Sequence, residues 1–124
     1  MRRLALLLLL ALVPALAAAG CGGTSNAPPV VQGGDPGTGK RLIEHYGCGS
    51  CHRIPGVKGA DGRVGPSLDG FRNVRYIAGH IANNPRNAID WIVNPQRIEP
   101  GTIMPKLGVS DQEARDIVAY LYRQ

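Results

Sequence analysis

The sequence predicts a small all-α domain of three to five helices, wrapped around a large apolar group. Three observations support this prediction. Helix-capping signals recur along the chain, no segment has the alternating pattern of a strand, and apolar core candidates are few. With a single Phe and a single Trp in 124 residues, so loop-rich a chain would be marginally stable unless a cofactor completed its core.

Residues 1–20 have the layout of a secretory signal peptide. Residues 1–3 are Met-Arg-Arg, residues 4–16 form an apolar run, and small residues follow. The run is too short to be read first as a membrane-spanning helix. We therefore expect an exported protein, on the periplasmic or cell-surface side of a membrane.

The sequence around Cys21, the residue directly after this segment, indicates how the chain is processed. Residues 18–21, Ala-Ala-Gly-Cys, resemble a bacterial lipoprotein box, although Ala18 stands where Leu is usual. Lipidation of Cys21 is favoured over simple cleavage near the alanines, because an unpaired cysteine in an exported protein otherwise needs explaining. Residues 21–35, rich in Gly and Pro, then predict a flexible tether from a lipid anchor to the domain at 36–124.

The charge balance gives no reason to expect nucleic-acid binding. The formal net charge is +5, and removal of residues 1–20 lowers it to +3. Lys and Arg are scattered along the chain rather than clustered, which is typical of a mixed solvated surface. No nucleic-acid partner is predicted.

The first helix of the domain is expected to begin at Asp35 and Pro36 and to stop at Gly47. Asp is a good N-cap, and Pro is pre-set for the first helical turn. The helix presents a short apolar face, made of Leu42, Ile43 and Tyr46.

Two further helices have clear signals. Asn84 and Pro85 begin one that Pro95 ends, and residues 110–113, Ser-Asp-Gln-Glu, form a capping box for the last helix. The apolar positions of the first are Ala88, Ile89, Ile92 and Val93, and those of the second are Ala114, Ile117, Val118 and Leu121. Residues 53–70 and 96–109 are expected to be loops, and a mixed pattern over residues 71–81 favours a short helix.

The motif of residues 48–52, Cys-Gly-Ser-Cys-His, admits several interpretations. A zinc site needs four ligands, and no further cysteine follows Cys51. A thioredoxin-like dithiol needs a preceding strand, which the pattern lacks. A disulfide between Cys48 and Cys51 would close a very small loop, with little entropic return.

Covalent haem attachment is the interpretation that remains, and His52 decides it. Each thiol, of Cys48 and Cys51, can form a thioether with one haem vinyl group, and the adjacent histidine becomes the proximal iron ligand. Gly49 and Ser50 are small enough for the turn to lie close to the macrocycle. The predicted cofactor is one covalent haem c.

Met104 is the favoured second axial ligand. It is the one methionine after residue 20, and Pro100 and Pro105 bracket its loop. His80 is the alternative, and His45 is less favoured because it is close to the attachment motif. A thioether ligand stabilises Fe(II) and raises the reduction potential. With both axial positions filled, we expect an electron carrier and not an enzyme.

These motifs resemble the class I mono-haem cytochrome c family over residues 39–122. The resemblance rests on Gly39, on "CGSCH", "GPSL" and "MP", and on the aromatic-bearing last helix "IVAYLY". It implies the small class I fold, in which the first and last helices cross near Gly39 and Tyr120. Ile43 departs from the pattern, since an aromatic residue is common at this position.

The resemblance also implies roles for further residues near the cofactor. The backbone carbonyl of Pro66 is expected to accept a hydrogen bond from His52, which would fix the ring. Trp91 matches an aromatic residue near a haem propionate, although a role in the core is equally compatible with the sequence. Arg72 or Arg75 is implied as a propionate partner.

Residues 75–108 are also similar to the cytochrome c domain fused to subunit II of some haem–copper oxidases. We therefore expect a free-standing, lipid-tethered, low-spin cytochrome that carries single electrons between respiratory-chain components. Its partners would be membrane complexes or other redox proteins, met in brief, small contacts. The alternatives are an electron-entry subunit of a dehydrogenase, reductase or oxidase, and a haem-based sensor.

Overall fold

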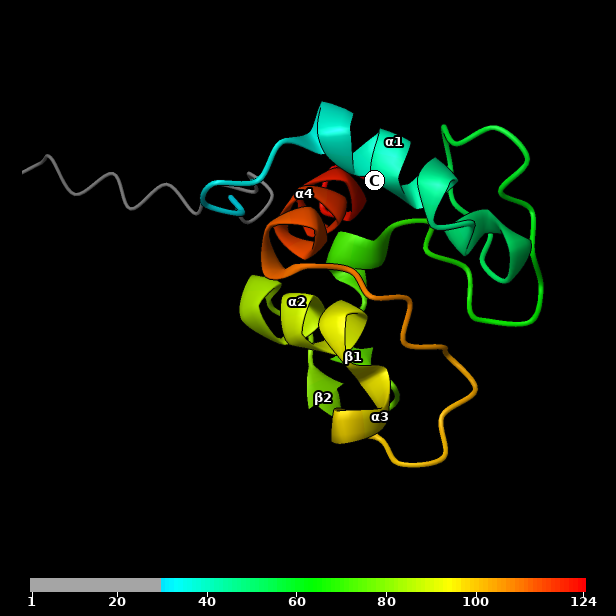
Figure 1. Ribbon diagram of the computed structural model, residues 1–124, viewed down its shortest axis with the longest axis vertical. Helices are drawn as coiled ribbons and strands as arrows, with labels where there is room; N and C mark the ends of the chain where they lie inside the picture. The colour runs from blue at the N-terminus through cyan, green and yellow to red at the C-terminus, as the bar shows by residue number, and fades with distance from the viewer. Residues whose placement is uncertain (1–29) are drawn as a thin grey trace, which may run out of the picture.

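The computed structural model describes residues 30–124 and is mostly helical, in agreement with the predicted all-α class (Figure 1). Its elements are α1 (Pro36–His45), β1 (Tyr76–Ile77), β2 (Ile81–Ala82), α2 (Pro85–Val93), α3 (Pro95–Ile98) and α4 (Asp111–Leu121). None of these helices is long and apolar enough to cross a membrane. The predicted signal peptide and the predicted lipidation site, Cys21, lie outside the described residues.

The crossing of α1 over α4 is the main helix–helix contact of the domain (Figure 1). Gly39 lies at this crossing, where an added Cβ would overlap the backbone carbonyl oxygen of Asp116 and lie 2.9 Å from the backbone nitrogen of Ile117. Only glycine allows two helix backbones to approach so closely. Ile43, one turn further along α1, is 1% exposed and continues the contact.

Tyr120, which the resemblance places at the same crossing, uses its hydroxyl elsewhere. The hydroxyl donates a hydrogen bond of 2.7 Å to the backbone carbonyl of Pro55. Gly56 makes room for it, because a Cβ there would lie 2.6 Å from the Tyr120 hydroxyl. The last helix therefore holds the loop that follows the attachment motif.

The three predicted N-caps are present. Asp35 accepts a hydrogen bond from the backbone N–H of Thr38 at 2.5 Å, and Asn84 accepts one from that of Asn87 at 2.9 Å. Ser110 and Glu113 form the reciprocal capping box of α4. The Ser110 hydroxyl and backbone N–H also hold the pKa of Glu113 below its ordinary value.

The prediction of a short helix over residues 71–81 is wrong. The structure has a single 3₁₀ turn at Phe71–Asn73, followed by an antiparallel hairpin in which Ile77 pairs with Ile81. Ala78 and Gly79 both have positive φ, of 50° and 82°, and so the chain turns back there instead of continuing a helix. Ala is unusual at such a position, which explains why the turn was not predicted from the sequence.

Residues 96–109 were predicted to be loop throughout, which is wrong at their start. The α2 helix ends before Pro95, as predicted, but Pro95 then serves as the first residue of α3. Pro95 is buried and the backbone N–H of Glu99 donates to its carbonyl at 2.9 Å. The rest of the segment, from Gly101 onward, is irregular.

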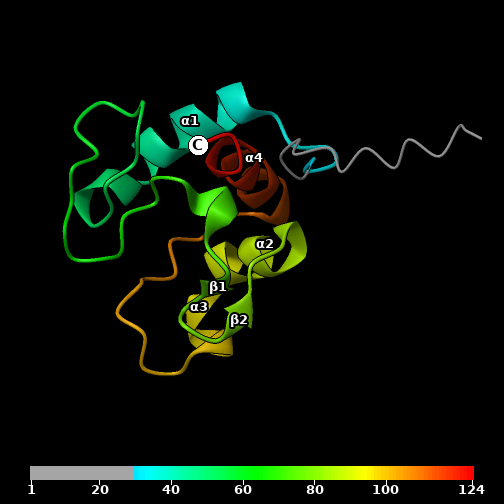
Figure 2. The ribbon, with the colours of Figure 1, turned by 180° about the vertical axis from the view of Figure 1, so that it is seen from behind.

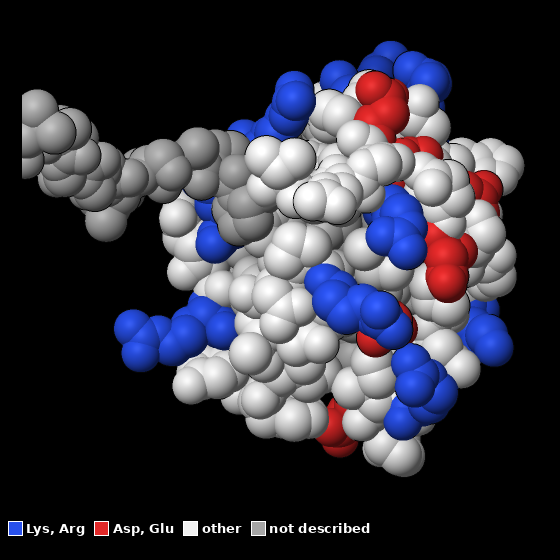
Figure 3. Space-filling model, turned by 90° about the vertical axis from the view of Figure 1, so that its left-hand side faces the viewer, with Lys and Arg blue, Asp and Glu red and all other residues white. Residues whose placement is uncertain are grey.

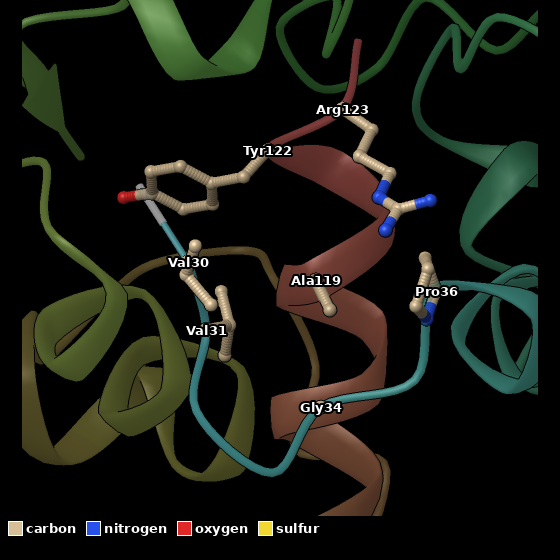
Figure 4. Close-up of a pocket in the computed structure, with 7 residues that line it drawn as sticks. All are labelled: Val30, Val31, Gly34, Pro36, Ala119, Tyr122 and Arg123. Carbon is tan, nitrogen blue, oxygen red and sulfur yellow. The ribbon is translucent and has the colours of Figure 1, made fainter. Parts of the chain in front are cut away.

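The segment before α1, which the sequence assigns to the tether, packs against α4 from Val31 onward. Val31 is buried, and a Cβ on Gly34 would lie 2.9 Å from that of Ala119 (Figure 4). The side-chain amide of Gln112 donates to the carbonyl of Gly33 at 2.8 Å, and the carboxylate of Asp116 accepts from the N–H of Asp35 at 2.8 Å. The packed domain thus begins before residue 36.

A network around Tyr122 joins α4 to the hairpin. The Tyr122 hydroxyl donates to the Asn83 side chain at 2.5 Å, and its ring meets that of Phe71 edge-on at 5.6 Å. The Asn83 amide in turn donates to the carbonyls of Phe71 and Val74 at 2.8 and 2.9 Å. Burial raises the pKa of Tyr122 to about 12.

The two long loops lie on the same side of the helical body. In Figures 1 and 2, the loop after the attachment motif and the loop between α3 and α4 project together, away from the segment at Val31. The helices thus bring residues 48–70 and 99–109, distant in sequence, to one side of the molecule.

We predict that Gly39→Ala destabilises the holoprotein by about 1–3 kcal/mol or more, because the methyl group overlaps the backbone of α4. Chemical denaturation measures the effect. Gly37→Ala, in the exposed first turn of α1, is the matched control and should leave stability unchanged or raise it slightly. Equal effects of the two substitutions would contradict the close-approach explanation.

We predict that Tyr122→Phe costs about 1–2 kcal/mol of stability, because the acceptor on Asn83 loses its donor. The folded-state pKa of Tyr122 exceeds the unfolded value of about 10, so its stabilisation is complete below pH 10. It is lost as the pH rises from about 10 to 12. Unfolding measured across this range should show the wild-type advantage shrinking, whereas Tyr76→Phe, on the exposed hairpin, controls for loss of a surface hydroxyl.

Candidate functional site

The attachment motif forms a tight turn directly after α1. Gly47 takes a left-handed conformation with φ 68°, and a 3₁₀ turn follows at Cys48–Ser50. The backbone N–H of His52 donates to the carbonyl of Cys48 at 3.0 Å. A Cβ on Gly49 would lie 2.6 Å from that of Ala60. The small size of Gly49, which the sequence analysis relates to the cofactor, thus also lets the following loop pack against the turn.

The two cysteines of the motif are half-buried, unbonded thiols. Burial raises the pKa of the Cys48 thiol above its ordinary value. At neutral pH this thiol is therefore protonated, whereas a reactive redox dithiol depends on a stabilised thiolate. The environment of Cys48 does not favour dithiol chemistry.

His52 is held by the backbone of the following loop. Its Nδ1 lies 2.7 Å from the carbonyl oxygen of Pro66, the residue that the resemblance implies. Because a carbonyl can only accept, Nδ1 carries the proton and Nε2 keeps its lone pair. That is the tautomer in which a histidine ligates a metal through Nε2.

Gly65 forms the floor under the imidazole, a role that the sequence reasoning missed. A Cβ on Gly65 would overlap Cε1 of His52 and lie 2.7 Å from Nδ1 and 2.9 Å from Nε2. The N–H of Gly65 donates to the carbonyl of Cys51 at 2.9 Å, which ties the two strands of the loop together. A glycine beside the motif Pro66-Ser67-Leu68 was the available signal.

Met104 is half-buried in the loop between α3 and α4. This loop lies on the same side of the molecule as the attachment turn (Figures 1 and 2). Its N–H donates to the hydroxyl of Thr102 at 3.3 Å, and its carbonyl accepts from the side-chain amide of Gln96 at 2.5 Å. Gln96 is a second residue that the sequence reasoning did not single out, because nothing in the pattern shows that α3 turns it toward this loop.

The alternative histidine ligands have other neighbours. His80 is exposed on the hairpin turn, with Nδ1 3.0 Å from the carbonyl of Ala78 and Nε2 3.5 Å from a carboxylate oxygen of Glu99. His45 is exposed at the end of α1, where its ring lies edge-on to that of Tyr46.

The remaining predicted residues lie on the α2 and hairpin side of the site. Trp91 is half-buried in α2 and packs against the core. Within residues 30–124, its indole N–H makes no hydrogen bond to protein, and it is not a buried unpaired atom, so it retains some access to solvent. Arg72 and Arg75 are both exposed, in the 3₁₀ turn and just before β1.

The residues present fit a covalent haem. Two thiols and an imidazole with a free Nε2 stand in one turn, and the loop that carries Met104 lies on the same side of the molecule. The loops that carry them also expose large apolar side chains, which water would otherwise surround: Val64 is 66% exposed, Ile103 78% and Leu107 41%. A flat apolar macrocycle would give these side chains a partner.

Comparison with known proteins agrees with this chemistry. The family model described as "Cytochrome c" matches residues 37–123. The chain belongs to the cytochrome c family. It is 38% identical over 109 residues to cytochrome c2 of Rhodopila globiformis, covering 77% of this chain and 95% of the relative. It is 34% identical over 104 residues to cytochrome c of Theileria annulata, covering 74% and 88%.

A further relative is larger than this chain. Cytochrome c oxidase subunit 2 of Alkalihalophilus pseudofirmus is 32% identical over 84 residues, which are 67% of this chain and 24% of that subunit. The chain thus spans about a quarter of that relative's length. The predicted class I cytochrome c fold is confirmed, haem c is the cofactor, and the protein is a haem-containing electron carrier.

We predict that Gly65→Ala disturbs the His52 ring, because the added methyl group overlaps it and breaks the contact with Pro66. The optical spectrum of the purified protein should show a changed or partly high-spin haem, with a lower yield of holoprotein. Gly37→Ala, far from the motif in the first turn of α1, should have neither effect. A wild-type spectrum from Gly65→Ala would contradict the packing described here.

Proposed function

We propose that this cytochrome carries single electrons with a low-spin haem attached to Cys48 and Cys51 and ligated by His52 and Met104. The observation that supports this most directly is the hydrogen bond between Nδ1 of His52 and the carbonyl of Pro66. It orients the ring, leaves Nε2 free for iron and increases the basicity of the ligand. When bound, the haem iron supplies a reversible one-electron couple.

Met104 is proposed as the sixth ligand on three grounds. It lies in the loop that shares a side of the molecule with the attachment turn, it is half-buried, and both its backbone N–H and its carbonyl are bonded. His80 is less suited, because both of its ring nitrogens already face the oxygens of Ala78 and Glu99. A thioether opposite an imidazole raises the reduction potential and leaves no open site for O₂ or peroxide. We therefore propose no catalytic turnover by this chain.

Trp91 is proposed to contact a haem propionate through its indole N–H. In the described part of the chain this donor has no protein acceptor, it is not a buried unpaired atom, and the ring packs on the core. We also propose that Arg72 or Arg75 neutralises a propionate. Both side chains are exposed, and both residues come just before the hairpin in sequence. Such contacts would anchor the cofactor at the edge away from the attachment turn.

We propose respiratory complexes as the redox partners, with the protein exported and held at a membrane by a lipid on Cys21. The similarity to part of a cytochrome c oxidase subunit 2 supports this partner class. On the face shown in Figure 3, Lys and Arg are distributed over the surface with Asp and Glu among them. This distribution supports brief protein contacts better than binding to nucleic acid.

The axial assignment predicts that Met104→Ala abolishes the weak iron–thioether band of the oxidised protein, lowers the reduction potential and allows rapid CO binding to the reduced protein. Spectroscopy, redox titration and CO mixing measure these changes. His80→Ala is the matched control and should behave as wild type. Loss of the low-spin spectrum in His80→Ala would transfer the ligand role to His80. Rapid CO binding by the wild type would favour a haem sensor.

A further inference from the structure

The loop that carries Met104 is held by very few hydrogen bonds. Within the described residues, no backbone–backbone hydrogen bond involves Ile103 to Val109 outside the helices and strands. Before it, the N–H of Thr102 donates to the carbonyl of Glu99 at 3.1 Å, and after it Val109 is buried ahead of the α4 cap. Between these two points the chain has no regular structure to hold it.

One side chain joins the middle of this loop to the helical body. The amide of Gln96 donates to the carbonyl of Met104 at 2.5 Å, across eight residues of chain. The other bond to Met104, from its N–H to Thr102, stays within the loop. Within residues 30–124, the bond from Gln96 is therefore the one hydrogen bond between the Ile103–Val109 segment and a helix.

Gln96 is well placed for this role. It follows Pro95, which is buried and begins α3, and the N–H of Glu99 closes the turn on the Pro95 carbonyl at 2.9 Å. Gln96 itself is half-buried, so water competes less with its amide for the carbonyl of Met104. Gln96 lies in α3, a turn that was not predicted from the sequence, and from there its amide reaches the Met104 loop.

We propose that Gln96 is a positioning residue that holds Met104 in place as the sixth ligand and thereby sets how readily that ligand is replaced. The proposal rests on the proposed function, because it requires Met104 to ligate the iron. Gln96 acts through the backbone of Met104 and does not itself touch the metal.

The expected size of the effect follows from an opening equilibrium. An added ligand such as imidazole binds only when the Met104 loop has moved away, so its apparent affinity is proportional to the open fraction. A net hydrogen bond of ordinary strength corresponds to roughly a two- to tenfold change in that fraction. Loss of the Gln96 bond should raise the apparent affinity for imidazole by the same factor.

The experiment is an optical titration of the oxidised holoprotein with imidazole, in wild type, Gln96→Leu and Gln96→Glu. Gln96→Leu removes the donor, and Gln96→Glu keeps the shape but places a carboxylate against the carbonyl. Both variants should bind imidazole roughly two- to tenfold more tightly, with a weaker iron–thioether band. Thermal unfolding in parallel reports any general loss of stability.

Gln112→Leu is the matched control. The Gln112 amide also makes a long-range hydrogen bond, to the carbonyl of Gly33, and a local one within α4 to the carboxylate of Asp116. Both lie at the N-terminal segment and not at the Met104 loop. It should lower stability and leave imidazole affinity unchanged. An equal rise in affinity in Gln112→Leu would attribute the effect to general loosening and overturn the proposal.

The two levels of the proposal fail in different ways. If the wild type lacks the iron–thioether band, Met104 is not the ligand, and the axial assignment fails together with the role of Gln96. If the band is present and Gln96→Leu binds imidazole with wild-type affinity, only the role of Gln96 is overturned.

Discussion

The close contact of α1 with α4 at Gly39 is the constraint on which the rest of the structure depends. It fixes the end of α1, from which Gly47 turns the chain into the attachment motif. It also fixes α4, whose Tyr120 donates to the Pro55 carbonyl, and Tyr122 at the end of α4, which donates to Asn83 just after the hairpin. Two helices from opposite ends of the domain thus locate both groups of loops, which have little regular structure of their own.

The two candidate iron ligands, His52 and Met104, are held to different degrees by the surrounding structure. The position of the His52 ring is well determined, because its Nδ1 is hydrogen-bonded to the carbonyl of Pro66 and the ring lies on Gly65. The loop of Met104 depends on single side-chain hydrogen bonds, from Gln96 and to Thr102. If Met104 ligates the iron as proposed, the bond between its thioether and the iron would itself help to order this loop.

Local signals in the sequence were sufficient for the three main helices, since capping and apolar spacing act over a few residues, as at Asp35, Asn84 and Ser110. The attachment motif and Pro66 could be found for the same reason, together with the family resemblance. The hairpin could not, because it depends on a left-handed conformation at Ala78, which alanine rarely adopts. Gly65 and Gln96 could not either, because their roles arise only when separate segments meet.

The packing of Val31 and Gly34 on α4 shortens the reach of the domain from its proposed anchor. With a lipid on Cys21, about ten residues would separate the membrane from the first buried side chain, which span at most about 35 Å when fully extended. A domain tethered in this way would stay within a thin layer above the bilayer. Its effective concentration toward partners in the same membrane would be high, of millimolar order, and it would be unable to visit partners in a second membrane farther away than this reach.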